Sequence, residues 1–299
     1  MSAKLEHLAY ILDDLEQNPR DIIAIVGPTC TGKTDLSLAL AQELKLPIIN
    51  ADSRLIFAEM NIGTAKPSDE ELGLIQHCLI NIKKPNEQYS AGAYRDDFDL
   101  CLKELGGRAI VVGGTGLYIR SALDNLDMPD IGRDIELREE LKAMELDVLT
   151  KMLDQLDPQA REDVDMKNKV RVIRAIEIVK LSGKPLSENR SKKTENRYDA
   201  AYYGLNFKNR KTLYDLINKR VIKMINKGLI HEVEALVAKY GVTDTLMGTI
   251  GYKEMIGYLQ GNYSITEGRK MIQKKTRVYA KRQMTWFNQN PNLRWLYHD

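Results

Sequence analysis

The sequence predicts an α/β protein in which a parallel sheet is flanked by helices and interrupted by a helical insertion, and three observations carry this prediction. Residues Gly27–Thr34 read G-P-T-C-T-G-K-T, a full match to the phosphate-binding loop G-x-x-x-x-G-K-[ST], between an apolar run and a helical pattern. Other apolar runs are separated by helical patterns, which is typical of a parallel sheet. A highly charged stretch, about 134–182, is helical and has few strand signals.

The helices and strands of the core are predicted from two sequence patterns. Helices are expected where leucines and other apolar residues repeat every three to four positions, and strands where a short run is continuously apolar. The expected strands are residues 22–26, 46–51, 109–112 and 202–205. The expected helices are residues 5–15, the stretch from the phosphate loop to Leu44, and residues 210–238 and 264–287.

The insertion divides the core into two parts. The helical pattern is broken at Lys184-Pro185 and by the polar run Ser187–Arg197, after which strand signals return. We therefore expect three segments: residues 1–124 as the first part of the core, 125–198 as the helical insertion domain, and 199–299 as the second part, which ends with a basic helix.

Composition is that of an ordinary soluble protein. The 44 basic and 42 acidic side chains give a net charge of +2, so any nucleic-acid signal must be local. Cys30, Cys78 and Cys101 are scattered, which predicts neither a zinc site nor a disulfide framework and fits a reducing compartment. Neither a membrane span nor a signal peptide is evident. We expect a cytoplasmic monomer without membrane contact.

The phosphate loop predicts a site for a di- or triphosphate. Its amides and the following helix N-terminus direct positive partial charge at an anion. Lys33 adds a full charge, and the Thr34 hydroxyl can ligate Mg²⁺. The alternative is a chance match in a surface loop, which the flanking strand and helix disfavour. The expected diphosphate-binding residues are Gly27, Pro28, Thr29, Cys30, Thr31, Gly32, Lys33 and Thr34.

Two further features follow the carboxyl ends of predicted strands, where ligands bind in open α/β sheets. Asp52 could hold Mg²⁺ or accept a proton from a nucleophile, or it could only cap a turn. Gly113–Gly116 could face the same cleft, or form a tight strand-to-helix turn without a ligand. The acidic residue that ATPases place at a strand end is missing after residues 109–112, which disfavours an ATP-driven motor or switch.

The C-terminal helical pattern carries a stripe of positive charge. No acidic residue lies between positions 269 and 282, and aromatic residues are interleaved or adjacent. The stripe comprises Lys270, Lys274, Arg277 and Lys281, widened by Lys275 and Arg282. Such a stripe favours binding to a nucleic-acid backbone, and the alternative is a solvated helix face.

Nine motifs run in order over nearly the whole chain. They are G-P-T-C-T-G-K-T (27–34), A-D-S-R (51–54), N-I-G-T-A-K-P (61–67), G-G-T-G-L-Y-I (113–119), R-V-I-R-A-I-E (171–177), S-G-K-P-L-S-E (182–188), R-V-I-K-M with G-L-I-H-E-V (220–233), I-G-Y-K-E (250–254) and Y-A-K-R-Q-M-T-W-F (279–287). With these motifs the chain resembles the tRNA dimethylallyltransferase family, also called tRNA isopentenyltransferases.

The resemblance implies a P-loop kinase-like fold, a requirement for Mg²⁺, and transfer of a dimethylallyl group from dimethylallyl diphosphate to N6 of adenosine 37 in the tRNA anticodon stem-loop. It implies that Asp52 is the general base, that Lys33, Thr34 and Arg220 act on the diphosphate, and that Thr115 lines the channel for the flipped adenine. The tRNA-binding residues that it and the basic stripe imply are Asp52, Ser53, Arg54, Leu55, Thr115, Arg171, Arg174, Lys274, Arg277, Lys281 and Arg282.

The chain also departs from the family pattern. It has Leu55-Ile56-Phe57 where Gln-Val-Tyr is usual, Cys78 and Asn81 where His and Asp are usual, and Asp165 where His is usual. Losing hydrogen-bonding groups near the adenine entrance predicts looser selection of tRNA sequence, unless another polar residue compensates.

Several alternatives stay open from the sequence. Arg171 and Arg174 could form helix-surface ion pairs with Glu177 or its neighbours instead of contacting tRNA. The enzyme could be an isopentenyltransferase of free adenine nucleotides, which has less use for the basic helix. It could also be a small-metabolite kinase or a nucleotide-dependent RNA-binding switch, which the glycines after residues 109–112 disfavour.

Overall fold

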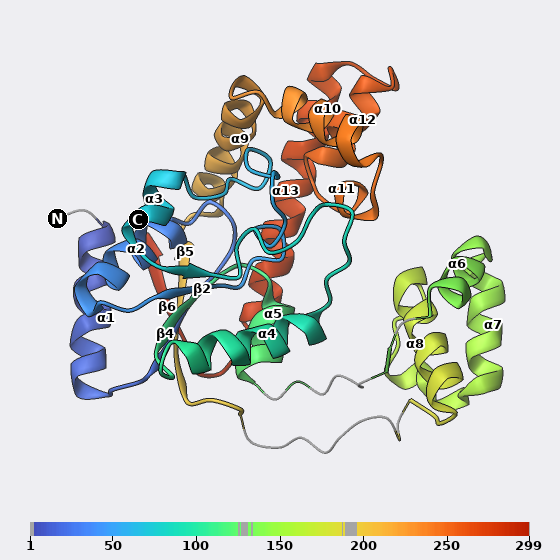
Figure 1. The fold of residues 1–299 in the computed structure, drawn as a ribbon, viewed down its shortest axis with the longest axis horizontal. Helices are drawn as coiled ribbons and strands as arrows, with labels where there is room; N and C mark the ends of the chain where they lie inside the picture. The colour runs from blue at the N-terminus through green and yellow to red at the C-terminus, as the bar shows by residue number, and fades with distance from the viewer. Residues whose placement is uncertain are drawn as a thin grey trace. The chain divides into compact units, whose positions relative to one another are not determined.

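The computed structural model describes residues 3–124, 126, 131–132, 134–186, 188 and 196–298. The chain divides into two compact units, one formed by Met1–Asp124 with Asn196–Asp299 and the other by Asn125–Glu195 (Figure 1). Most of the expected polar run Ser187–Arg197 lies outside the described residues. None of the described helices combines the length and the apolar character needed to cross a membrane.

A six-stranded sheet with the order β3-β2-β4-β1-β5-β6 forms the centre of the first unit. Its strands are β1 (Ile22–Val26), β2 (Ile48–Asn50), β3 (His77–Cys78), β4 (Ala109–Val112), β5 (Ala200–Phe207) and β6 (Leu293–His298). All their pairings are parallel, with Ile25 of β1 opposite both Val112 of β4 and Tyr203 of β5. The loops that follow β1, β2 and β4 therefore share one edge of the sheet.

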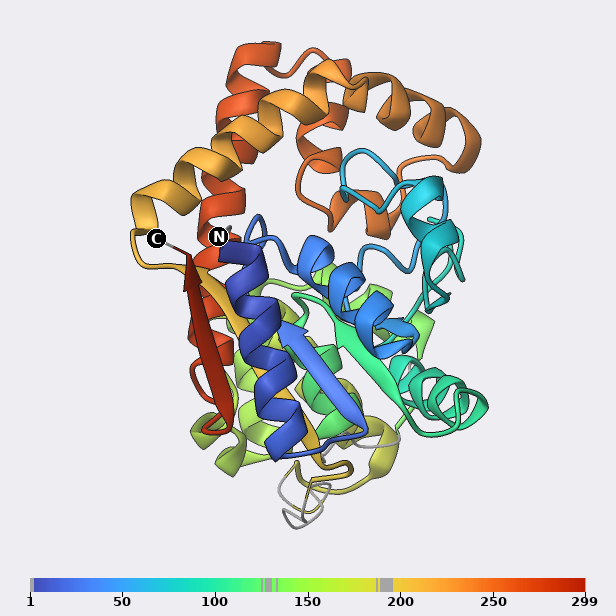
Figure 2. The ribbon, with the colours of Figure 1, turned by 90° about the vertical axis from the view of Figure 1, so that its left-hand side faces the viewer.

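Alternate strand residues supply two hydrophobic layers. Ile23 and Ile25 pack with the helices that precede and follow β1, whereas Ala24 and Val26 belong to the layer on the other face. Figure 2 shows the blue helices α1 and α2 in front of the sheet. The helices of this unit are α1 (Ala3–Gln17), α2 (Lys33–Leu44), α3 (Asp69–Leu74), α4 (Ala91–Glu104), α5 (Gly116–Leu123), α9 (Arg210–Asn226), α10 (Leu229–Tyr240), α11 (Asp244–Met247), α12 (Tyr252–Leu259) and α13 (Ile265–Phe287).

The C-terminal helices gather beyond the carboxyl ends of the strands, and α13 extends from them to the sheet (Figures 1 and 2). It contacts α9, α12 and α5 along its length. The expected helix over 210–238 is two helices, because Gly228 adopts φ 100°, a left-handed conformation that glycine reaches at little cost and that ends α9. The long α13 thus joins the helical group to the predicted site.

The second unit is a helical unit with its own apolar core. It contains α6 (Ile135–Ala143), α7 (Leu146–Leu156), the 3₁₀ turn η1 (Pro158–Glu162) and α8 (Lys169–Ser182). Leu149 and Leu153 of α7 are fully buried against Val172 and Ile176 of α8. Residues 134–182 are therefore helical, as the charge pattern predicts.

The predicted fold class is confirmed, and the differences are local. The strands at 22–26 and 109–112 lie where expected, whereas the second strand is shorter than 46–51 and the fourth expected run, 202–205, extends to Ala200–Phe207. Two edge strands were not predicted. β3 is only two residues long, and β6 reads L-R-W-L-Y-H, in which neither the apolar run nor the alternation is clean.

Candidate active site

The phosphate loop follows β1 and is held by its own side chains. The Pro28 carbonyl accepts hydrogen bonds from the Thr31 hydroxyl (2.9 Å) and from the Lys33 ammonium (2.7 Å). Gly27 has φ 129°, and a Cβ at this position would lie 2.4 Å from the Leu205 carbonyl oxygen of β5. Only glycine fits there, so β5 fixes the path by which the loop leaves the sheet.

The Lys33 ammonium is the electrostatic centre of the loop. Burial lowers its pKa to about 8, because a charged amine is less stable away from water. The Asp52 carboxylate opposes this shift, whereas the Arg220 guanidinium adds to it. Three residues predicted from separate motifs therefore lie within electrostatic reach of one another.

Asp52 follows β2 in a turn that its neighbours fix. The Asn50 side chain accepts a hydrogen bond from the Asp52 amide (2.9 Å) and donates one to the Asp52 carbonyl (3.0 Å). Asp52 Oδ1 accepts a hydrogen bond from the Arg54 amide at 2.9 Å, so the turn-capping role exists. Its Oδ2 has no hydrogen-bond partner among the described residues, which leaves that oxygen free for a second role.

The glycine turn after β4 lies against the Asp52 segment. A Cβ on Gly113 would lie 2.2 Å from the Ala51 carbonyl oxygen, so the two segments can meet only through glycine. The Thr115 hydroxyl accepts a hydrogen bond from the Ser53 amide (3.0 Å) and donates one to the Ser53 hydroxyl (3.2 Å). The turn is therefore part of the site rather than a remote connection.

Two side chains of α13 reach the same place, and sequence reasoning missed their roles. Tyr279 is hydrogen-bonded to Thr115, and its burial, together with the nearby Asp52 carboxylate, raises its pKa. Gln283 is only 5% exposed and accepts a hydrogen bond from the Thr29 amide (3.0 Å) while donating one to the Gly114 carbonyl (2.8 Å). The spacing of four residues puts both on one helix face, the only signal that could have indicated them.

Arg220 enters the site from α9. One of its guanidinium nitrogens lies 3.8 Å from the Cys30 sulfur in the phosphate loop, and another donates a hydrogen bond to the Thr64 carbonyl at 3.3 Å. The site thus combines two cations and a row of amides with a carboxylate that has a free oxygen. Such a site can bind a phosphorylated ligand and accept a proton beside it.

The comparisons with known proteins agree with this chemistry. A family model described as IPP transferase matches residues 55–290, and one described as Isopentenyl transferase matches residues 20–86. The chain is 41% identical over 292 residues to a tRNA dimethylallyltransferase of Acetivibrio thermocellus, covering 93% of this chain and 92% of that protein. The chain belongs to the tRNA dimethylallyltransferase family. It is also 38% identical over 280 residues to the tRNA dimethylallyltransferase of Gloeobacter violaceus, covering 93% and 92% of the two chains.

Solved structures of tRNA dimethylallyltransferase relatives share the fold. A tRNA isopentenylpyrophosphate transferase from Bacillus halodurans superposes with a TM-score of 0.68 at 37% identity, covering 92% of this chain and 89% of that chain. A eukaryotic dimethylallyltransferase described as acting on tRNA superposes with a TM-score of 0.78 at 25% identity, covering 93% and 74%.

The residues of the basic stripe of this tRNA dimethylallyltransferase family member differ in the contacts that they make. Lys274 and Lys281 are exposed, and neither ammonium has a hydrogen bond or ion pair among the described residues. Arg277 instead donates to the Asn218 side chain at 2.6 Å, and Arg282 lies 5.9 Å from the centroid of the Tyr279 ring. Lys270 is likewise exposed and without such a partner in the described part of the chain, whereas the Lys275 ammonium is paired with Glu254 at 2.7 Å. The three exposed lysines are thus available to a partner.

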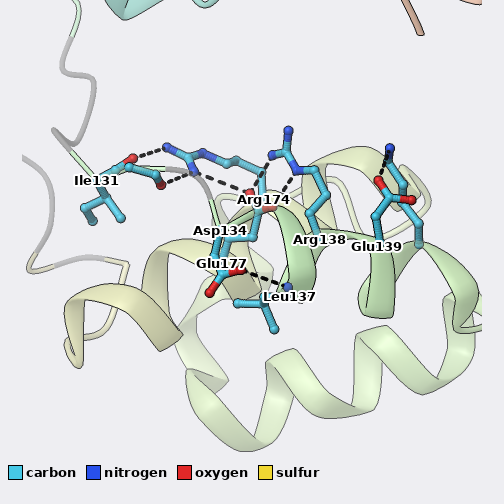
Figure 3. Close-up of polar contacts among 9 residues, drawn as sticks. Ile131, Asp134, Leu137, Arg138, Glu139, Arg174 and Glu177 are labelled. Carbon is cyan, nitrogen blue, oxygen red and sulfur yellow. Dashed lines mark hydrogen bonds and ion pairs between the residues drawn. The ribbon is translucent and has the colours of Figure 1, made fainter. Parts of the chain in front are cut away.

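The two insertion arginines, matched to a tRNA dimethylallyltransferase motif, have different surroundings. Glu177 is fully buried and forms a bidentate pair with Arg138 at 2.5 and 2.6 Å. Arg174 lies 3.4 Å from the same carboxylate and donates to the Ile131 carbonyl at 3.0 Å, as Figure 3 shows. The ion-pairing alternative is therefore present for Arg174. The side chain of Arg171 is 63% exposed, and its guanidinium is 3.9 Å from Asp165.

The residues that depart from the tRNA dimethylallyltransferase pattern also differ in how deeply they are buried. Ile56 and Phe57 are core residues, so they cannot present groups to a base. Leu55 is only half-buried and stays a candidate for base selection. Asn81 accepts a hydrogen bond from Lys66 at 2.5 Å, where the family's usual aspartate would add a charge. Burial lowers the Lys66 pKa to about 8.

The Ser53–Arg54 segment, which the resemblance assigns to tRNA, is tied to two parts of the fold. Ser53 is bonded to Thr115, as described, and the Arg54 guanidinium donates a hydrogen bond to the Gly248 carbonyl at 2.9 Å. Gly248 follows α11, so the guanidinium is fixed by the helical group. The segment is held in one conformation before any partner binds.

Proposed function

We propose that this protein transfers the dimethylallyl group of dimethylallyl diphosphate to N6 of adenosine 37 in the anticodon loop of tRNA, releasing diphosphate. The convergence of Lys33, Arg220 and Asp52 at one edge of the sheet carries the proposal. The names of the relatives, which are tRNA dimethylallyltransferases, support it, as does the neighbour described as acting on tRNA.

The diphosphate end of the site consists of the phosphate loop with Lys33 and Arg220. Negative charge grows on the diphosphate as the bond between its oxygen and the allylic carbon breaks. Donors that are already oriented stabilise that charge without the cost of reorganisation, which is usually a large contribution to catalysis. The loop amides and the two cations have that arrangement, so this end binds the substrate and stabilises the leaving group.

The acceptor end is built around Asp52. The N6 lone pair forms the new bond to the allylic carbon, and N6 must lose a proton as its charge becomes positive. The free Oδ2 of Asp52 accepts that proton, while Oδ1 remains bonded to the Arg54 amide. Thr115 and Tyr279 line the same end with hydroxyl groups that can hydrogen-bond an adenine edge.

The residues present fit a magnesium ion that is held mostly by the substrate. Thr34 is exposed in the first turn of α2, and its hydroxyl has no hydrogen-bond partner in the described part of the chain. No group of three His, Cys, Asp or Glu side chains among those residues could hold a metal by itself. A single hydroxyl suits Mg²⁺, which keeps waters and phosphate oxygens as ligands and would neutralise diphosphate charge. We expect EDTA to abolish activity and Mg²⁺ to restore it.

Lys274 and Lys281 are the residues we assign to the tRNA backbone. Both ammonium groups are exposed and unpaired within the described residues, and phosphate contacts need such free cations. In the insertion, Arg171 is a better candidate than Arg174, whose guanidinium is occupied by Glu177 and Ile131. We further propose that the protein is a cytoplasmic monomer. Light scattering after size-exclusion chromatography tests whether it is monomeric.

One experiment separates this function from its closest alternative. The purified protein is incubated with labelled dimethylallyl diphosphate and either tRNA or AMP. The proposal predicts label in tRNA and none in AMP. Label in AMP but not in tRNA would identify an isopentenyltransferase of free nucleotides and overturn the proposal.

A further inference from the structure

The loop that carries the N-I-G-T-A-K-P motif is bound to one carboxylate of α10. Glu232 Oε2 accepts hydrogen bonds from the amides of Asn61 (2.9 Å) and Ile62 (2.7 Å). Its Oε1 accepts hydrogen bonds from the Gly63 amide (3.0 Å) and from the Tyr252 hydroxyl (2.7 Å). Four donors thus converge on one side chain, and three are consecutive backbone amides, a strong arrangement for a charged acceptor.

The fit around this carboxylate is tight. Tyr252 is fully buried, and a Cβ on Gly63 would lie 2.4 Å from its ring. Burial and the adjacent Glu232 carboxylate raise the pKa of the Tyr252 hydroxyl, so it remains a donor. Three motif segments that the mechanism above does not use, 61–67, 228–233 and 250–254, therefore meet in one hydrogen-bonded cluster.

The residue that follows these three amides contacts the active site. The Thr64 carbonyl accepts a hydrogen bond from the Arg220 guanidinium at 3.3 Å. On its other side Arg220 reaches Cys30 of the phosphate loop and acts on Lys33 as a like charge, lowering the Lys33 pKa. Arg220 has no ion pair with any residue that the structure describes. A neutral carbonyl thus holds it beside a second cation.

We propose that Glu232 is a positioning residue for Arg220, acting through the backbone of residues 61–64. Repulsion between Arg220 and Lys33 favours movement of the guanidinium away from the phosphate loop when no diphosphate is bound. The Thr64 carbonyl opposes that movement only if the loop is fixed, and Glu232 fixes it. Arg220 is then already oriented when the substrate arrives, which avoids the cost of ordering it on binding. This inference rests on the proposed role of Arg220 at the diphosphate.

Glu232→Gln is the sharpest test, because the amide keeps the size of the side chain. It replaces one oxygen with an NH₂ group that faces two donors, so half of the anchor is lost. We expect the KM for dimethylallyl diphosphate to rise about tenfold, the order of one hydrogen bond to a charged group, with the KM for tRNA unchanged. Glu59→Gln is the matched control, since Glu59 also contacts α10, through Lys239 and Tyr240, but binds no amide of the loop.

A double-mutant cycle with Arg220→Lys distinguishes positioning from a general loss of structure. If Glu232 acts through Arg220, Glu232→Gln adds little to the KM of the Arg220→Lys variant, because the two residues form one unit. If the two effects multiply, Glu232 acts elsewhere and the inference is wrong. If Arg220→Lys alone raises KM and Glu232→Gln does not, only the inference fails. If Arg220→Lys has no effect, the proposed role of Arg220 fails as well.

Tyr252→Phe gives a second test that does not depend on how well the first variant folds. It removes one donor to Glu232 and leaves the carboxylate and the buried ring in place. We expect a smaller increase in KM for dimethylallyl diphosphate, of about two- to threefold, again absent on the Arg220→Lys background. An unchanged KM, or an equal increase in both backgrounds, contradicts the inference.

Discussion

Raising the pH through the pKa of Lys33 should weaken binding of the diphosphate. Burial lowers this pKa to about 8, so the ammonium loses its charge in a range where an ordinary lysine keeps it. With that pKa, about nine in ten Lys33 side chains are charged at pH 7 and about one in ten at pH 9. Because a phosphate requires the charged form, the KM for dimethylallyl diphosphate should rise about tenfold over this interval.

The assay is initial-rate kinetics at saturating tRNA from pH 6.5 to 9.5. At the upper end of this range the diphosphate is almost fully ionised. Lys33→Arg is the control, since a guanidinium stays charged throughout. Its KM should be higher than that of the unmodified protein at pH 7 but flat with pH. A KM that does not change in the unmodified protein, or that rises equally in Lys33→Arg, would show that the charge of Lys33 does not control diphosphate binding.

Four other substitutions test three separate parts of the protein. Asp52→Asn should lower kcat by roughly 10²–10⁴ while the Kd for tRNA stays near normal, and near-normal turnover would leave Asp52 only its turn-capping role. Lys274→Ala and Lys281→Ala should each lower the salt slope of log K for tRNA by about one unit, and an unchanged slope in the double variant would mean that this helix face is merely solvated. Leu55→Gln should sharpen discrimination between anticodon-loop variants, and if the ratio of their kcat/KM values does not move, Leu55 does not govern base choice.

The central strands and the phosphate loop could be predicted because their signals are local. The run 22–26 is apolar on both faces, as a buried parallel strand requires, and the loop after it is a complete motif. β6 could not be predicted in the same way. It is an edge strand that pairs only with β5, and half-exposed residues such as Arg294 interrupt its apolar pattern.

The candidate site likewise contains some residues whose positions the sequence predicts and others whose positions it does not. Asp52 and Thr115 follow strand ends, so their proximity follows from the parallel topology. Gln283 and Glu232 lie far along the chain from the loops that they hold, and nothing in a helical periodicity says which buried polar residue will meet a loop amide. Such contacts depend on how α10 and α13 pack, and a single sequence does not specify that packing.

The partner of an individual charged side chain is the feature of the site that the sequence predicts least well. Arg171 and Arg174 look equivalent in the sequence, yet one guanidinium is exposed and the other is bound to Glu177 and to a backbone carbonyl. In the basic stripe, Arg277 is bonded to Asn218, whereas Lys274 is unpaired in the described part of the chain. A cation is available to tRNA only if no neighbouring side chain has already bound it, and that depends on tertiary structure.

The most direct test of the proposed reaction is to measure its two expected products together with ADP, which should not form. The protein is incubated with Mg²⁺, ATP, dimethylallyl diphosphate and tRNA, and dimethylallyl-adenosine, diphosphate and ADP are quantified while nuclease digestion and mass spectrometry locate the modified base. We expect one diphosphate to be released for each dimethylallyl group, attachment at N6 of adenosine 37, and no ADP. Release of ADP in step with modification, or attachment at another atom or position, would contradict the proposed reaction.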